Sequence, residues 1–269
     1  MAAPLRLRAG EWTDDTSMAL CLAESLLECD GFDPADQMSR YLRWYREGHL
    51  GSNGRCVDIG LTVRAALERY ERTGEPYSGS TDPHSAGNGS LMRLAPVALR
   101  YAATPTVALV RAADSSRTTH GAAEAVDACR YFAGLIVGAL QGASKEELLA
   151  ARFSPVVGAW EAWPLAPAIA AIADGSFKSK QPPAIRGDGY VVHSLEAALW
   201  ALHGSATFEE GCLKAVNLGD DADTTAAIYG QLAGALHGEE AVPARWRAQL
   251  ALCETIEGFA DALCARARR

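Results

Sequence analysis

The sequence lacks several features, and each absence excludes a class of protein. Its 269 residues contain no uninterrupted apolar run of about 18 residues, which a membrane-spanning helix would need. Its seven cysteines include no CxxC pair, so we expect reduced, mostly buried thiols rather than disulfides or a zinc site. Residues 1–6 show no apolar signal-peptide segment. Together these absences predict a cytoplasmic protein.

Positive charge is also scarce. Lys and Arg total 25 against 33 Asp and Glu, which gives a formal net charge of −8. Such a charge makes nucleic acid an unlikely partner and disfavours anionic membranes, but it would not repel a protein that presents an arginine. The chain also has no His-Asp dipeptide, which disfavours a metal-dependent HD phosphohydrolase.

Strand-type alternation and internal repeats are missing, whereas helical periodicity runs through most of the chain. Met18, Leu22 and Leu26, for example, recur every four residues on one broad apolar face. We therefore predict an all-α fold that forms a single domain over residues 1–269. The expected helices cover about 13–31, 34–47, 57–72, 90–101, 122–140, 190–203, 208–216 and 221–237, with a broken helical stretch over 144–174 and a last helix after Pro243. Long polar loops are expected over 74–89 and 176–189, and a shorter one over 115–120.

Two acidic clusters stand out, each at the start of an expected apolar helix. Asp220, Asp221 and Asp223 crowd into four positions beside Thr224, and residues 13–16 read Thr-Asp-Asp-Thr. Asp and Thr also cap ordinary helices, so either cluster alone could be a plain helix start. Crowded carboxylates repel one another, and a cation relieves that repulsion. Two such clusters about two hundred residues apart indicate two halves of one metal site.

The chemistry of these residues narrows the metal and the ligand. Carboxylate and hydroxyl oxygens favour Mg²⁺ or Mn²⁺ over Zn²⁺. Two ions held about 3.5–4 Å apart can orient a substrate and activate a water molecule. The glycine-rich helix entry at Gly87, Asn88, Gly89 and Ser90 offers backbone N–H groups that suit a diphosphate.

The chain resembles the ADP-ribosylglycohydrolase family, most closely the branch that removes ADP-ribose from an arginine of dinitrogenase reductase. The segments that carry the resemblance, in order along the chain, are residues 12–16, 56–60, 86–96, 119–120, 189–193 and 219–224. The resemblance implies an all-helical fold in which helix N-termini converge on a cleft with two Mg²⁺ or Mn²⁺ ions. It implies metal ligation by Thr13, Asp14, Asp15, Asp221, Asp223 and Thr224, with Asp220 outside the pattern.

The resemblance also assigns substrate contacts and a reaction. It implies that ADP-ribose contacts Asp58, Gly87, Asn88, Gly89, Ser90, His120 and Tyr190. From the residues themselves, three alternatives stay open: His120 could cap a helix, Tyr190 could be a core residue, and Asp58 could start a helix. The implied reaction is hydrolysis of the N-glycosidic bond between ADP-ribose and a protein arginine, with Asp14, Asp15 and Asp223 as catalytic carboxylates and ADP-ribose as product.

One departure from the family concerns the N-terminus. Similar proteins begin with an apolar helix and a glutamate that approaches the metals, whereas only twelve residues precede Thr13 here and none is a matching glutamate. We therefore expect the family's N-terminal helix to be missing from this sequence, which keeps a non-catalytic ADP-ribose-binding protein open as an alternative. Serine or nucleic acid remains open as the group that carries the ADP-ribose. A prenyl-diphosphate synthase is disfavoured, because Met18 stands where its Asp-Asp-x-x-Asp motif needs an aspartate.

Overall fold

The computed structural model describes residues 7–267, and helices dominate this part of the chain. Within it, β-structure is limited to two isolated bridges, Ser80 with His120 and Gly87 with Tyr190, so the all-α prediction is confirmed. No helix in the described part combines the length and the apolar character that crossing a bilayer demands. The expectation about residues 1–6 lies outside the described residues, and the single domain over 1–269 stays a prediction.

Residues 7–267 contain fourteen α-helices and three short 3-10 helices. The α-helices are α1 Asp14–Glu28, α2 Pro34–Glu47, α3 Leu61–Thr73, α4 Ala95–Arg100, α5 Pro105–Arg117, α6 Ala123–Leu140, α7 Lys145–Leu148, α8 Ala159–Ala162, α9 Pro167–Ala173, α10 Val191–His203, α11 Phe208–Val216, α12 Ala222–His237, α13 Ala244–Arg247 and α14 Cys253–Ala267. The 3-10 helices are η1 Pro83–Ser85, η2 Ser176–Lys178 and η3 Glu239–Ala241.

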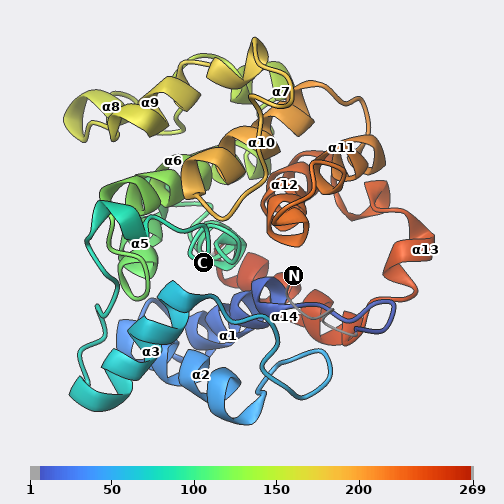
Figure 1. The fold of residues 1–269 in the computed structure, drawn as a ribbon. Helices are drawn as coiled ribbons and strands as arrows, with labels where there is room; N and C mark the ends of the chain where they lie inside the picture. Colours follow the sequence, from blue (N-terminus) through green and yellow to red (C-terminus); the bar gives the residue numbers. More distant parts are fainter. Residues whose placement is uncertain (1–6, 268–269) are drawn as a thin grey trace.

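Helix α6 is the centre of the core. Its sequence is apolar on nearly every face, as expected of a helix that is surrounded by protein, and thirteen of its residues are buried. It packs against α5, α4, α10 and α12, and Figure 1 shows α5, α6 and α10 together across the middle of the molecule.

Helix α1 is held in place from both ends of the sequence. It packs against α2 and α4, and also against α14, which Figure 1 shows beside α1 although the two are far apart in the chain. Met18 and Leu22 of α1 are fully buried, as the periodicity indicated. Because α1 and α12 also touch, the starts of these two helices can share one site.

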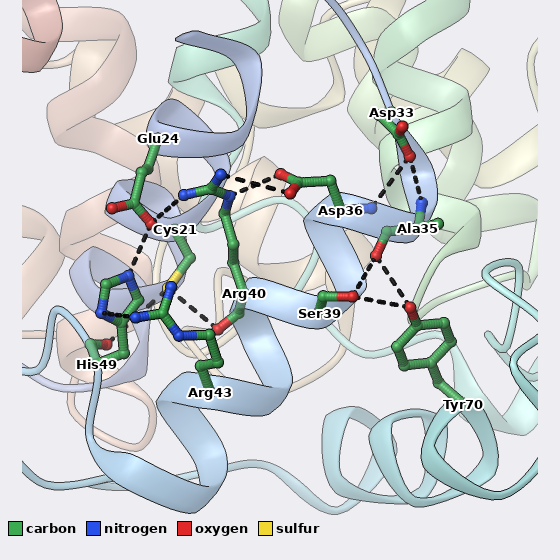
Figure 2. A network of polar contacts seen from close by, with 10 residues as sticks. All are labelled: Cys21, Glu24, Asp33, Ala35, Asp36, Ser39, Arg40, Arg43, His49 and Tyr70. Atoms are coloured by element: carbon green, nitrogen blue, oxygen red, sulfur yellow. Dashed lines mark hydrogen bonds and ion pairs between the residues drawn. The ribbon is translucent and has the colours of Figure 1, made fainter. Parts of the chain in front are cut away.

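A polar network fixes α2 against α1 and α3 (Figure 2). Arg40 of α2 pairs with Glu24 of α1 and, at 2.6 Å between Nε and Oδ2, with Asp36. The same Glu24 lies 2.7 Å from Nε2 of His49, in the loop after α2. The network therefore ties the loop after α2 to α1.

Several predicted boundaries are wrong for identifiable reasons. Helix α3 begins at Leu61 rather than Val57, because Asp58 has a left-handed φ of 61° that no helix accommodates. Residues 90–93 form turns before α4 begins at Ala95, and the predicted last helix is divided into α13 and α14. Residues 115–117, which were expected to be loop, form the end of α5. Among the cysteines, only Cys21 and Cys129 are fully buried, and Cys29 is exposed.

Candidate active site

The two acidic helix starts meet in space. The hydroxyl of Thr13, just before α1, lies 2.9 Å from Oδ2 of Asp15 and 2.9 Å from Oδ2 of Asp223 in α12. Thr224 Oγ1 approaches Asp15 Oδ2 at 3.5 Å. These contacts join residues that are 210 positions apart in the chain. The side chains of the two helix starts thus bond to one another across the site. Neither Thr13 nor Asp221 caps its own helix with a side-chain hydrogen bond.

The glycine-rich turn is tied to the same place. Asn88 donates through Nδ2 to Oδ2 of Asp221 at 2.7 Å and to the hydroxyl of Ser194 at 2.9 Å. Its backbone N–H donates to the carbonyl of Gly189, while the N–H of Asp221 donates to the carbonyl of Gly187 at 2.8 Å. The segment 187–189 therefore connects the acidic cluster to the glycine-rich turn.

His120 completes the enclosure from the gap between α5 and α6. Its side chain is 1% exposed. The N-cap residue of α6 is Ala122, so His120 does not cap that helix, which was the alternative left open by the sequence. Its ring rests on the glycine-rich turn: a Cβ added to Gly89 would lie 2.9 Å from His120 Cε1. Only glycine leaves room for the imidazole at this position.

These elements surround one cavity of about 450 Å³. Its lining includes Asp14, Asp58, Asp221, Thr224, Gly87, Asn88, Gly89 and His120. One wall is acidic, and an adjoining wall, joined to it by the hydrogen bond from Asn88 to Asp221, is formed by backbone and the buried imidazole. A pocket with convergent polar groups of this kind is the usual form of an enzyme active site.

Comparison with known proteins identifies the family. The family model described as ADP-ribosylglycohydrolase matches residues 2–269. The chain belongs to the ADP-ribosylglycohydrolase family. It is 45% identical over 264 residues to a protein of Pseudomonas putida named ADP-ribosylarginine hydrolase Tri1, covering 98% of this chain and 69% of that protein. The family assignment identifies the protein as an enzyme of the glycosidase class.

Two further relatives agree with this assignment. A Rhodospirillum rubrum protein named ADP-ribosyl-[dinitrogen reductase] glycohydrolase is 31% identical, covering 91% of this chain and 76% of that protein. A solved structure titled ADP-ribosylglycohydrolase-related protein complex has a TM-score of 0.84 and 48% identity, covering 98% of this chain and 85% of that chain. The family resemblance drawn from the sequence motifs is confirmed.

The acidic wall is electrostatically strained. Burial, followed by the charges of Asp15, Asp58 and Asp223, raises the pKa of Asp14 well above its ordinary range. Burial and the charge of Asp223 raise the pKa of Asp15 to about 7. Burial also raises the pKa values of Asp58 and Asp221. Each of these shifts records the cost of holding negative charges close together in a poorly hydrated place.

The donors of the protein do not satisfy this cluster, and the residues fit the metal ions that the family implies. Thr13 has one hydroxyl hydrogen for two carboxylates, and the buried Oδ1 of Asp15 has no hydrogen-bond partner. An oxygen-only donor set of this kind suits Mg²⁺ or Mn²⁺. Residues 7–267 contain no ready-made cage of three or more His, Cys, Asp or Glu side chains. Binding would therefore require the carboxylates that Thr13 now links to turn toward the ion.

Three predicted contact residues lie differently from the rest. Asp58 is exposed at the cavity in its left-handed conformation, and α3 is capped by Gly60, so Asp58 does not start that helix. Ser90 does not line the cavity, because its buried hydroxyl is engaged by Ser116 at 2.9 Å. Tyr190 stands beside the site, where its hydroxyl donates to Glu124 at 2.6 Å.

Sequence reasoning missed the residues that support the site from behind. Arg93 and Thr119 hold His120, Ser194 holds Asn88, and Glu124 holds Tyr190. Arg93 and Thr119 both fall within the family-like segments 86–96 and 119–120, which was the one available signal. Their role depends on burial, which the motif alone does not reveal.

Proposed function

We propose that this protein is a metal-dependent hydrolase that removes ADP-ribose from arginine side chains of proteins. The observation that carries the proposal is the convergence of both acidic helix starts, the glycine-rich turn and His120 on one cavity. The names of relatives in Pseudomonas putida and Serratia proteamaculans, both called ADP-ribosylarginine hydrolase, support arginine as the linkage. The Serratia relative is 40% identical, covering 97% of this chain and 69% of that protein.

The proposed metal ligands are Thr13, Asp14, Asp15, Asp221, Asp223 and Thr224. A bound pair of Mg²⁺ or Mn²⁺ ions would supply polarisation of substrate oxygens and a lower pKa for water. The reaction breaks the bond between C1″ of the distal ribose and a guanidine nitrogen, and its transition state resembles an oxocarbenium ion. A carboxylate on the acidic wall stabilises the positive charge that develops on the sugar.

The same carboxylates can move the protons that the reaction needs. Hydrolysis takes a proton from water and returns one to the departing guanidine nitrogen. A carboxylate held within hydrogen-bond reach of the reacting atoms can take up the first proton and supply the second. We assign these proton transfers to the group formed by Asp14, Asp15 and Asp223.

The two walls of the cavity suit the two ends of the substrate. The imidazole of His120 and the backbone N–H of Gly89, which has no partner among the described residues, offer donors to the diphosphate and ribose oxygens. Asp58 presents an exposed carboxylate at the cavity, where it can pair with the guanidinium of the target arginine. Asp58 therefore contributes to the preference for arginine.

A matched pair of substitutions tests the proposal. Asp223→Asn and Asp220→Asn each remove one negative charge from exposed positions at the start of α12, but only Asp223 contacts Thr13. With Mn²⁺ or Mg²⁺ present, we expect release of ADP-ribose from ADP-ribosylarginine to fall at least about 100-fold in Asp223→Asn, in line with loss of a catalytic group. Asp220→Asn should stay within about threefold of the wild type.

The substrates in this assay decide between the alternatives. Serine-linked and nucleic-acid-linked ADP-ribose are offered beside the arginine linkage, and binding of free ADP-ribose is measured by calorimetry. Turnover of another linkage in preference to arginine would reassign the acceptor. Binding of ADP-ribose by the wild type without turnover of any linkage would make the protein a binding module and refute the hydrolase.

A further inference from the structure

Arg93 is a buried cation without a counterion. Its side chain is fully buried, and no carboxylate within residues 7–267 pairs with it. It lies instead over the ring of Tyr41, at 4.4 Å from the centroid, and its Nη2 donates to Thr119 Oγ1 at 2.7 Å. Longer contacts reach Thr118 Oγ1 and the carbonyl of Ser115, both at 3.4 Å. Burying an unpaired guanidinium costs free energy, which indicates that Arg93 has a specific role in the protein.

The contact to Thr119 leads directly to His120. Thr119 Oγ1 lies 2.9 Å from Nδ1 of His120. A guanidinium can only donate hydrogen bonds, so the Thr119 oxygen accepts from Arg93. The hydrogen of Thr119 is then free for Nδ1 of His120, which becomes an acceptor. In a neutral imidazole whose Nδ1 accepts, the proton sits on Nε2.

The other protonation states of His120 fit less well. If Nδ1 carried the proton and donated to Thr119, the hydroxyl hydrogen of Thr119 would have no acceptor among the described residues, which is costly in a buried place. A doubly protonated ring would place a second positive charge beside Arg93. Burial and that charge lower the pKa of His120 to about 3, so the ring is neutral at physiological pH.

The opposite nitrogen, Nε2, faces the site. Within residues 7–267 it has no hydrogen-bond partner, and the ring belongs to the lining of the cavity. Cβ atoms added to Gly87 and Gly89 would each lie 3.3 Å from Nε2, so this edge of the ring borders the glycine-rich turn. A proton on Nε2 can therefore be given to an oxygen atom of a bound ligand.

We propose that Arg93 is a positioning residue, which acts through Thr119 to hold His120 as the neutral tautomer with its proton on Nε2, a donor for the phosphate or ribose oxygens of ADP-ribose. The choice of ligand rests on the proposed function. The tautomer itself is a property of the free protein and can be measured without any ligand.

The first test is the tautomer of His120, read from the ¹⁵N chemical shifts of both ring nitrogens in the full chain labelled at histidine. We expect Nδ1 unprotonated and Nε2 protonated at pH 7, with no change down to pH 5. Thr119→Val removes the hydroxyl, so the two tautomers should mix, whereas Thr119→Ser should keep the wild-type pattern. The matched control is Thr118→Val, because Thr118 contacts Arg93 but not His120.

The second test changes Arg93 itself. Arg93→Lys keeps a donor and should retain the tautomer, whereas Arg93→Met removes the donor and should give a mixture. If Arg93→Met does not fold, the threonine pair decides the question alone. In the folded variants with mixed tautomers, we expect the affinity for ADP-ribose to fall in proportion to the remaining Nε2-protonated fraction, about twofold for an even mixture.

Three results would overturn this inference: a proton on Nδ1 in the wild type, a folded Arg93→Met protein with the wild-type tautomer, or a Thr119→Val protein with the tautomer and affinity of Thr118→Val. Failure of the proposed function looks different. If the wild type did not bind ADP-ribose at all, the hydrolase assignment would fail, while the ¹⁵N shifts would still show whether Arg93 and Thr119 set the tautomer.

Discussion

Replacing Asp15 by Asn should stabilise the protein when no divalent cation is present. Asp15 is 4% exposed, its Oδ1 has no hydrogen-bond partner, and the charge of Asp223 lies nearby. The asparagine has nearly the same shape and removes the charge. The side chain can still accept a hydrogen bond from Thr13. Relief of repulsion should therefore outweigh any lost contact.

The size of the effect follows from the raised pKa. The shift from 3.8 to about 7 corresponds, at about 1.4 kcal/mol per unit, to roughly 4 kcal/mol when Asp15 is ionised at pH 8. After about 1 kcal/mol for a weakened hydrogen bond to Thr13, we expect a net gain of roughly 2–3 kcal/mol. For a chain of this size the gain should raise Tm by about 5–10 °C.

The dependence on pH has a definite sign. A carboxyl whose pKa is raised by folding binds its proton more tightly in the folded than in the unfolded protein. Its penalty is absent below the unfolded value of 3.8, grows as the pH rises toward 7, and is complete above 7. In a chelating buffer, the advantage of Asp15→Asn over the wild type should therefore increase from pH 5 to pH 8.

Thermal unfolding in EDTA and in Mn²⁺ checks both parts of this reasoning. At a free Mn²⁺ concentration of about 100 times Kd, the free energy of unfolding of the wild type should rise by roughly 2.7 kcal/mol, whereas that of Asp15→Asn should rise little. The stability difference between the two proteins should therefore shrink or change sign. Asp220→Asn is the control for a charge that does not contact the cluster. Equal stabilisation of wild type and Asp15→Asn by Mn²⁺, or a less stable Asp15→Asn in EDTA at pH 8, would refute the account.

Two further substitutions test packing around the site. Gly89→Ala places a Cβ 2.9 Å from His120 Cε1. It should lower the free energy of unfolding in urea by about 1–3 kcal/mol and weaken ADP-ribose binding at least about tenfold. The control is Gly230→Ala, whose added Cβ has no atom within 4 Å and should stabilise α12 by up to about 1 kcal/mol. Arg40→Met removes the pairs to Glu24 and Asp36 in Figure 2 and should cost about 1–2 kcal/mol while the turnover number stays unchanged, which unfolding and a kinetic assay separate.

Much of the fold could be predicted because many of its helices have clear start signals in the local sequence. The starts of α1 and α12 follow from Asp and Thr ahead of apolar periodicity, and α2 follows from Pro34 after the capping Asp33. The end of α5 was predicted as loop because its last turn is Ser115-Ser116-Arg117, which has the composition of a loop. There the helix is set by burial of small residues against α6, which is a tertiary effect.

The meeting of the two acidic clusters could be predicted for the same local reason, whereas contacts that depend on burial could not. That the clusters of Asp15 and Asp223 meet could be inferred from their shared chemistry, and the geometry agrees. Ser90 was expected at the ligand, but α6 and the end of α5 take up its hydroxyl. Arg93 was not foreseen as a supporting residue, because arginine is rarely buried without a carboxylate and composition gives no sign of that exception.

The distribution of charge across the cavity explains why two distant kinds of residue belong to one site. The substrate that we propose is itself divided, with a cationic guanidinium at one end and an anionic diphosphate at the other. The protein answers with carboxylates from α1, α12 and Asp58 on one wall. On the other wall it uses neutral donors, and Arg93 keeps His120 neutral there instead of touching the ligand itself. A free cation in the cavity would attract the acidic cluster and compete with the metal ions for it. We infer that Arg93 is buried behind Thr119 so that its charge acts on the imidazole while the carboxylates remain available to the metals.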